Sequence, residues 1–149
     1  MPRSLNMQNH YPVNADRLFE LVTDLDTLEA VTRPWVQFDH LPSGQVRQGQ
    51  VINVAMSVLG LFPTLPYRME VTEFDAVARR MTSVETGSGV RRLAHTLEVT
   101  PDGDGDGAIL QDRIEIDAGW KTPLVMVWAW GTYRWRHHLR LRLLNGDRI

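Results

Sequence analysis

Two polar side chains interrupt otherwise apolar strand faces, and they are the strongest candidates for chemistry in the sequence. His95 alternates with leucine and valine over 90–99, and Asp112 alternates with leucine and isoleucine over 108–118. A charged group is costly to bury without a partner, so each residue needs one if both faces point inward. Either His95 or Arg136 can pair with Asp112. An Asp112–Arg136 pair would be a structural polar contact that ties the sheet to the final helix.

The same residues, His95 and Asp112, are also the candidate catalytic groups. In an apolar cavity they would orient a carbonyl or hydroxyl group of a ligand. His95 would then act as a general base, because histidine exchanges protons near neutral pH. Tyr67 is a further acid–base candidate at an inward-facing strand position.

Methionine and tryptophan supply the candidate lining of a ligand cavity. Three methionines fall on successive predicted strands at positions that can share one face. Methionine adapts to many shapes, so these residues either fill an ordinary core or form a plastic cavity wall. The candidate ligand-binding residues are Met56, Tyr67, Met69, Met81, His95, Asp112, Trp128 and Trp135.

One long helix over 122–144 must position the other half of this site. Pro123 suits the first turn of a helix, and Asn145-Gly146 is a stop signal. The apolar residues of this segment follow two helical stripes, so we expect one stripe on a sheet and the other on another element, a partner or a ligand. The first stripe is Leu124, Trp128, Trp135 and Leu139; the second is Met126, Trp130, Tyr133, His137, Leu141 and Leu144.

Arginines interrupt this helix, so we expect no stable insertion into a membrane. They are Arg134, Arg136, Arg140 and Arg142. Cations at the carboxyl end of a helix suit its dipole, and we therefore expect these last turns to present a solvated basic face.

The elements before this helix predict an antiparallel sheet. A first strand over 5–11 is followed by two short helices, for which Asn14 and Asp24 are the expected N-caps. Further strands are expected at 36–41, 50–59, 67–71, 79–85, 90–99 and 108–118. Consecutive hairpins favour an α+β fold in which a curved antiparallel sheet of six to seven strands wraps around the C-terminal helix. Such an arrangement leaves room for a cavity between sheet and helix.

Five short patches occur in an order that is typical of one superfamily. They are Asn14-Ala-Asp-Arg-Leu-Phe19, Thr32-Arg-Pro-Trp35, His95-Thr96, Leu110-Gln-Asp-Arg-Ile114 and Tyr133-Arg-Trp-Arg-His137. Over nearly the whole chain they resemble the START/Bet v 1-like superfamily, also called the polyketide cyclase/dehydrase and lipid-transport (SRPBCC) superfamily. The resemblance implies a helix-grip fold. It also implies one of three roles: binding lipids, sterols or polyketides, cyclising polyketides, or binding a partner protein.

The chain departs from the commoner pattern of this superfamily at two positions. Leu93 and Leu97 stand where many relatives carry a tryptophan and a second histidine. The polar lining that those relatives use is therefore reduced here, which argues against catalysis.

The bulk composition excludes several classes of protein. A chain of 149 residues suits one domain, 1–149. The formal net charge of −2 argues against a dedicated nucleic-acid binder. The absence of cysteine excludes disulfides, zinc thiolate sites and cysteine nucleophiles. The first residues lack the apolar core of a secretory signal, so we expect a soluble protein of the cytoplasm.

Two patterns that could suggest a metal do not support one. Residues 102–107 match the first half of a calcium loop, but the twelfth position holds Arg113 and the run lies between strands. We therefore expect a hairpin turn there. His137 and His138 are adjacent in a helix, so their rings point about 100° apart. We expect no metal and no cofactor.

The leading hypothesis is a domain that binds a hydrophobic, lipid-, polyketide- or aromatic-like molecule between sheet and helix. The alternative is a cyclase- or aromatase-type enzyme that uses His95 and Asp112. A third hypothesis is a protein-interaction module with a filled cavity. In that case the second helical stripe and an apolar loop over 60–66, which contains Phe62, would form a homodimer or partner interface.

Overall fold

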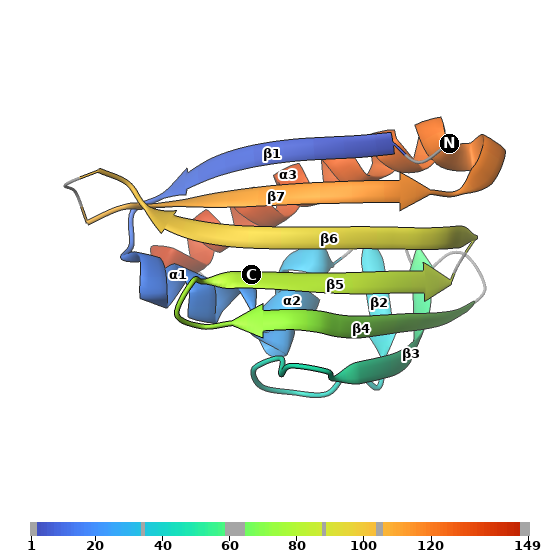
Figure 1. Cartoon of the computed structure of the whole chain (residues 1–149), viewed down its shortest axis with the longest axis horizontal. Coiled ribbons are helices and arrows are strands. Elements are labelled where there is room, and N and C mark those ends of the chain that lie inside the picture. The colour runs from blue at the N-terminus through green and yellow to red at the C-terminus, as the bar shows by residue number, and fades with distance from the viewer. Residues whose placement is uncertain (1–2, 34, 59–64, 88, 104–105, 147–149) are drawn as a thin grey trace.

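The computed structural model of the protein contains one curved seven-stranded antiparallel sheet with its helices on one face (Figure 1). It describes residues 3–33, 35–58, 65–87, 89–103 and 106–146. The strands are β1 (Arg3–Tyr11), β2 (Val36–Asp39), β3 (Val51–Val58), β4 (Leu65–Asp75), β5 (Arg80–Gly87), β6 (Val90–Pro101) and β7 (Ala108–Asp117). The helices are α1 (Ala15–Val22), α2 (Leu25–Thr32), the 3₁₀ turn η1 (Gly119–Lys121) and α3 (Thr122–Leu144).

The sheet follows the predicted hairpin succession. Its order is β1-β7-β6-β5-β4-β3-β2, so the first strand closes one edge beside the last. A glycine is required where β4 and β5 meet, because a Cβ at Gly87 would overlap the backbone of Pro66. The helix-grip architecture predicted from the sequence, with two short helices after the first strand, is thereby confirmed.

Local signals place the short helices where the sequence predicts them. The side chain of Asn14 accepts a hydrogen bond from the Arg17 amide at 2.8 Å, and Asp24 accepts from the amides of Asp26 and Thr27. These bonds satisfy amide groups that have no partner within the first turn. The strand expected at 36–41 is shorter, because His40 has a φ of 64°, which is incompatible with an extended strand.

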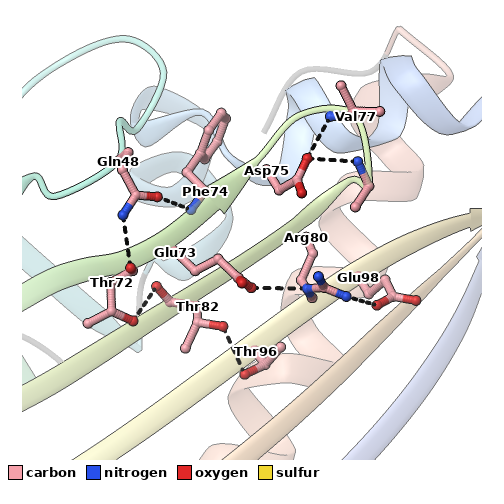
Figure 2. A network of polar contacts seen from close by, with 11 residues as sticks. Gln48, Thr72, Glu73, Phe74, Asp75, Val77, Arg80, Thr82, Thr96 and Glu98 are labelled. Carbon is pink, nitrogen blue, oxygen red and sulfur yellow. Dashed lines mark hydrogen bonds and ion pairs between the residues drawn. The ribbon is translucent and has the colours of Figure 1, made fainter.

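The face of the sheet opposite the helices carries a polar network (Figure 2). Arg80 contacts Glu73 at 3.0 Å and Glu98 at 3.5 Å, which links β4, β5 and β6.

The pairing of β4 with β5 shifts register between Val71 and Glu73. Gln48 spans this irregularity by donating to the Thr72 carbonyl and accepting from the Phe74 amide. The polar side chains on this face leave the opposite one for the core and the cavities.

The burial of α3 corrects the sequence prediction. Leu124 and Trp130 belong to the predicted apolar stripes, yet they are 68% and 52% exposed. Arg140 was expected on a solvated basic face, yet it is only 5% exposed. The helix buries one narrow face against the curved sheet, and that face runs through Ala129, Tyr133 and Arg140. A pattern that counts only apolar residues cannot find such a face.

Part of the third hypothesis falls outside the described residues. In the apolar loop over 60–66, the structure of residues 60–64, Phe62 among them, is not described. In the hairpin loop over 102–107, only the ends are described, where the Asp102 amide donates to the Gly107 carbonyl.

Candidate functional site

The two polar residues singled out in the sequence form a buried pair. In the pairing of β6 with β7, Leu97 stands opposite Asp112 and His95 stands opposite Ile114. His95 and Asp112 are therefore diagonal neighbours on one face of the sheet. The His95 Nε2 atom lies 2.6 Å from the Asp112 Oδ1 atom, and the two residues are 7% and 4% exposed. Of the two partners considered for Asp112, the structure pairs it with His95.

A tyrosine from α3 extends this pair into a chain of three groups. The Tyr133 hydroxyl lies 3.3 Å from the His95 Nδ1 atom. Burial alone would raise the pKa of Asp112, but the hydrogen bond and charge of His95 and the charges of Arg140 and Arg136 hold that pKa below its usual value. The ionised carboxylate can only accept, so His95 Nε2 donates to it. Burial raises the pKa of Tyr133, so its hydroxyl keeps its proton beside His95 Nδ1.

A second carboxylate belongs to the same interior. Glu85 on β5 accepts hydrogen bonds from the Tyr67 hydroxyl at 2.7 Å and from the Ser83 hydroxyl at 3.1 Å, one on each carboxylate oxygen. Burial, together with the charge and hydrogen bond of Glu85, raises the pKa of Tyr67. Tyr67 therefore stays protonated and acts as a donor.

Two arginines of α3, Arg136 and Arg140, face the same interior from the helix side, opposite the sheet. The Arg136 guanidinium lies 4.6 Å from the ring centre of Tyr133. In the described part of the chain, no hydrogen bond or ion pair joins Arg136 to Asp112, which is bonded to His95 instead, although the charge of Arg136 contributes to the lowered pKa of Asp112. Among the described residues, neither Arg136 nor Arg140 forms an ion pair with a carboxylate. The Nε atom of each is buried and has no hydrogen-bond partner there.

Two adjoining cavities lie between the sheet and α3. The inner cavity has a volume of about 70 Å³ and the outer one about 240 Å³. Phe38, Glu85, Tyr133 and Arg136 line both, so the cavities meet at a largely polar constriction. The arrangement offers apolar walls with a few donors and an acceptor, which is the usual character of a small-molecule site.

Most of the predicted lining residues border these cavities. Met69, Met81 and His95 line the inner cavity. Met56, Tyr67 and Trp128 line the outer one. Asp112 lines neither and lies behind His95. That these residues bind a ligand stays a prediction.

Trp135 is placed away from both cavities. It lines a surface groove with α2, and its Nε1 atom donates to the Arg33 carbonyl at 2.9 Å. The reason is geometric: residues two apart in a helix point about 200° apart, and Tyr133 already points into the cavities. The stripe that joined Trp128 with Trp135 in the sequence therefore divides between two surroundings.

Sequence reasoning missed several polar residues of the site. Met81, Ser83 and Glu85 occupy alternate positions of one strand, and all three line the inner cavity. Because alternate residues of a strand share a face, the predicted position of Met81 in the cavity wall could have predicted the same face for Glu85. Arg140 follows Arg136 at the i, i+4 spacing of one helix face. Its burial could not be seen in the sequence, because arginine is mostly exposed in proteins.

The fold and the cavity between sheet and helix define a member of the START/Bet v 1-like superfamily. A family model described as "polyketide cyclase / dehydrase and lipid transport" matches residues 3–137, so the chain belongs to this family. No curated protein matches the sequence. Among the described residues, no helix is both long and apolar enough to cross a membrane.

Solved structures share the fold at low sequence identity. Norcoclaurine synthase from Thalictrum flavum is 16% identical with a TM-score of 0.68, covering 95% of this chain and 94% of that one. A START superfamily protein from Mycobacterium smegmatis is 12% identical with a TM-score of 0.68, covering 95% and 98%. The Zhui aromatase/cyclase from Streptomyces sp. R1128 is 17% identical with a TM-score of 0.59, covering 78% and 68%.

Proposed function

We propose that the protein binds a hydrophobic small molecule in the two cavities between the sheet and α3. The observation that carries this proposal is the outer cavity of about 240 Å³, whose apolar walls include Met56, Leu93 and Trp128. Burying apolar ligand surface there would contribute about 25 cal/mol per Å². Polar groups at the constriction would fix the orientation of the ligand.

Similar proteins support a ligand of this kind. The family description includes lipid transport. A structure of norcoclaurine synthase contains dopamine and hydroxybenzaldehyde, two small aromatic molecules. The apolar and aromatic walls of the outer cavity suit either a lipid-like or an aromatic ligand.

A pair of tryptophan variants tests the location of the site. Leu93→Trp should fill part of the outer cavity, whereas Leu124→Trp changes an exposed residue of α3. We expect anilinonaphthalene sulfonate, an anionic fluorescent probe of apolar sites, to bind the wild type and Leu124→Trp alike and to bind Leu93→Trp at least several-fold more weakly. Equal binding to all three folded proteins would contradict a site in the outer cavity. Native mass spectrometry of protein purified from its own host would identify a retained compound.

A cyclase- or aromatase-type enzyme is the second candidate, and the chain from Asp112 through His95 to Tyr133 favours it. Tyr133 borders both cavities, so a proton can be delivered to a bound molecule from a hydroxyl that is linked to a buried base. His95→Gln keeps a donor toward Asp112 but cannot exchange a proton. In an enzyme this variant should lose turnover and keep ligand binding; unchanged turnover would contradict the role of His95.

Self-association through α3 is the third candidate. Trp120, Leu124, Val127 and Trp130 are all exposed and lie on the first half of this helix and the turn before it. Gly131 lies in the same region of the helix, and a Cβ added to it would meet no atom of the described residues within 4 Å, so a second copy of the chain could approach closely there. Sedimentation at increasing concentration tests this candidate; a monomer at the highest concentration would contradict it.

A further inference from the structure

The inner cavity is lined by a buried cation that forms no ion pair with a carboxylate of the described chain. Arg140 is 5% exposed and lines the inner cavity together with Arg136. A guanidinium stays charged at any ordinary pH, and burying it without an ion pair costs several kcal/mol. Among the described residues, neither arginine makes an ion pair, and both Nε atoms lack a hydrogen-bond partner.

The carboxylates of the interior are already engaged. Glu85 uses one oxygen for Tyr67 and the other for Ser83. Asp112 accepts a hydrogen bond from His95 at 2.6 Å. Tyr11 also lies beside Arg140, but burial raises the pKa of this tyrosine, so its hydroxyl is neutral and offers no countercharge. Arg136 and Arg140 therefore line the inner cavity without an ion pair from the described chain, although Asp24 and Glu85 line the same cavity and the charges of both arginines lower the pKa of Asp112.

The size of the inner cavity limits what that acceptor can be. Its volume of about 70 Å³ suits a group the size of a carboxylate, and apolar walls that include Met69, Met81 and Leu97 surround the remaining space. Phe38 and Tyr133 also line the outer cavity, so a larger molecule can extend from the inner cavity into the outer one. A ligand that satisfies both cavities has a carboxylate at one end and an apolar body at the other.

We propose that the ligand is an amphipathic carboxylic acid, whose carboxylate binds Arg140 and Arg136 in the inner cavity while its apolar part occupies the outer cavity. This inference rests on the proposed binding function. Arginine is suited to the role, because its planar donors match the geometry of a carboxylate and charge-assisted hydrogen bonds are stronger than neutral ones.

Matched ligands test the inference on the wild-type protein. Calorimetry at pH 7.5 would compare decanoic acid with 1-decanol, and 2-naphthylacetic acid with 2-naphthaleneethanol, below the concentrations at which they aggregate. Each pair differs mainly in the charged group. We expect at least one acid to bind about tenfold or more tightly than its alcohol. Acid and alcohol binding equally would overturn the carboxylate inference and leave the proposed function intact. No binding of any of the four compounds would count against both.

Two arginine variants locate the effect. Arg140→Met approximately keeps the side-chain volume and removes the charge, whereas Arg134→Met removes an exposed arginine of the same helix that lies against Trp130. We expect Arg140→Met to lose the preference for the acid while binding the alcohol as before, and Arg134→Met to behave as the wild type. A preference that survives in folded Arg140→Met would overturn the assignment to Arg140. If that variant does not fold, the wild-type comparison of acids with alcohols still decides the inference.

Discussion

The two halves of α3 place their side chains in opposite ways. In the first half, large apolar residues such as Leu124, Val127 and Trp130 are exposed. In the second half, Arg140 is buried and Arg136 lines both cavities. A helix packed on one sheet normally turns its apolar stripe inward and its charges outward. In the second half, buried Arg140 therefore shares the inward side of the helix with Leu139, Leu141 and Leu144, which are buried or partly buried.

The surroundings of the two halves explain the difference. The first half packs on Ile114 and Ile116 of β7 through a narrow strip that includes Ala129, which leaves its larger residues outside. Exposed Trp120 and Trp130 each lie under a cation, Lys121 at 5.6 Å and Arg134 at 5.7 Å. The second half faces the cavities, and the charges of its Arg136 and Arg140 lower the pKa of buried Asp112 without forming an ion pair with it. The following predictions separate the two regions, beginning with the largest effect.

Removing the imidazole from the polar interior should have the largest effect. His95→Leu would leave Asp112 as a buried carboxylate without its hydrogen-bond donor, so we expect the free energy of unfolding to fall by about 3–5 kcal/mol. Urea denaturation measures the change. The double variant His95→Leu/Asp112→Leu is the control, because it removes the charge together with its donor and should recover much of the loss. A single variant as stable as the wild type would show that the pair contributes little.

Acid should weaken the same interior through Asp112. The pKa of Asp112 is lowered in the folded protein, so its contribution to stability is present above the unfolded value of 3.8 and is lost as the pH falls through the folded value below it. Below about pH 4 the free energy of unfolding of the wild type should therefore fall more steeply than that of Asp112→Asn. Denaturation at several pH values measures both. Parallel curves would contradict an ionised Asp112.

In the exposed half, a small substitution should stabilise the protein. Gly131 is a helical residue with open space around it, so Gly131→Ala should raise the free energy of unfolding by about 0.5–1 kcal/mol. Thermal denaturation of a dilute sample measures the gain. If a second copy packs on this face, the same variant should also weaken the dimer. A loss of stability in the monomer would mean that the face is covered within one chain.

The smallest effect is expected at the exposed leucine. Leu124→Ala should change the free energy of unfolding by no more than about 0.5 kcal/mol, because the side chain is largely in solvent. Leu139→Ala is the matched control, since it removes the same side chain from a buried position of the same helix and should cost about 2–5 kcal/mol. Equal losses would contradict the contrast between the two halves.

The sequence alone determined the elements and their order. Alternation predicted the strands, Asn14 and Asp24 predicted the two helix starts, and the signals at Pro123 and Asn145 bounded α3 at the residues observed. These features are local, because each depends on hydrogen bonds and backbone preferences within a few residues. The interruption of apolar alternation by His95 and Asp112 was local as well, and it pointed to the pair that the structure contains.

Which side chains share the interior depends on how the strands and α3 pack together. The register of β6 with β7 places His95 beside Asp112, and the rotation of α3 adds Tyr133 and Arg140 while it turns Trp135 toward α2. Neither the register nor the rotation is encoded within one segment, because both depend on how a curved sheet and a helix fit together. The burial of Arg140 follows from that fit. It could not be predicted from the sequence, because arginine is exposed in most proteins.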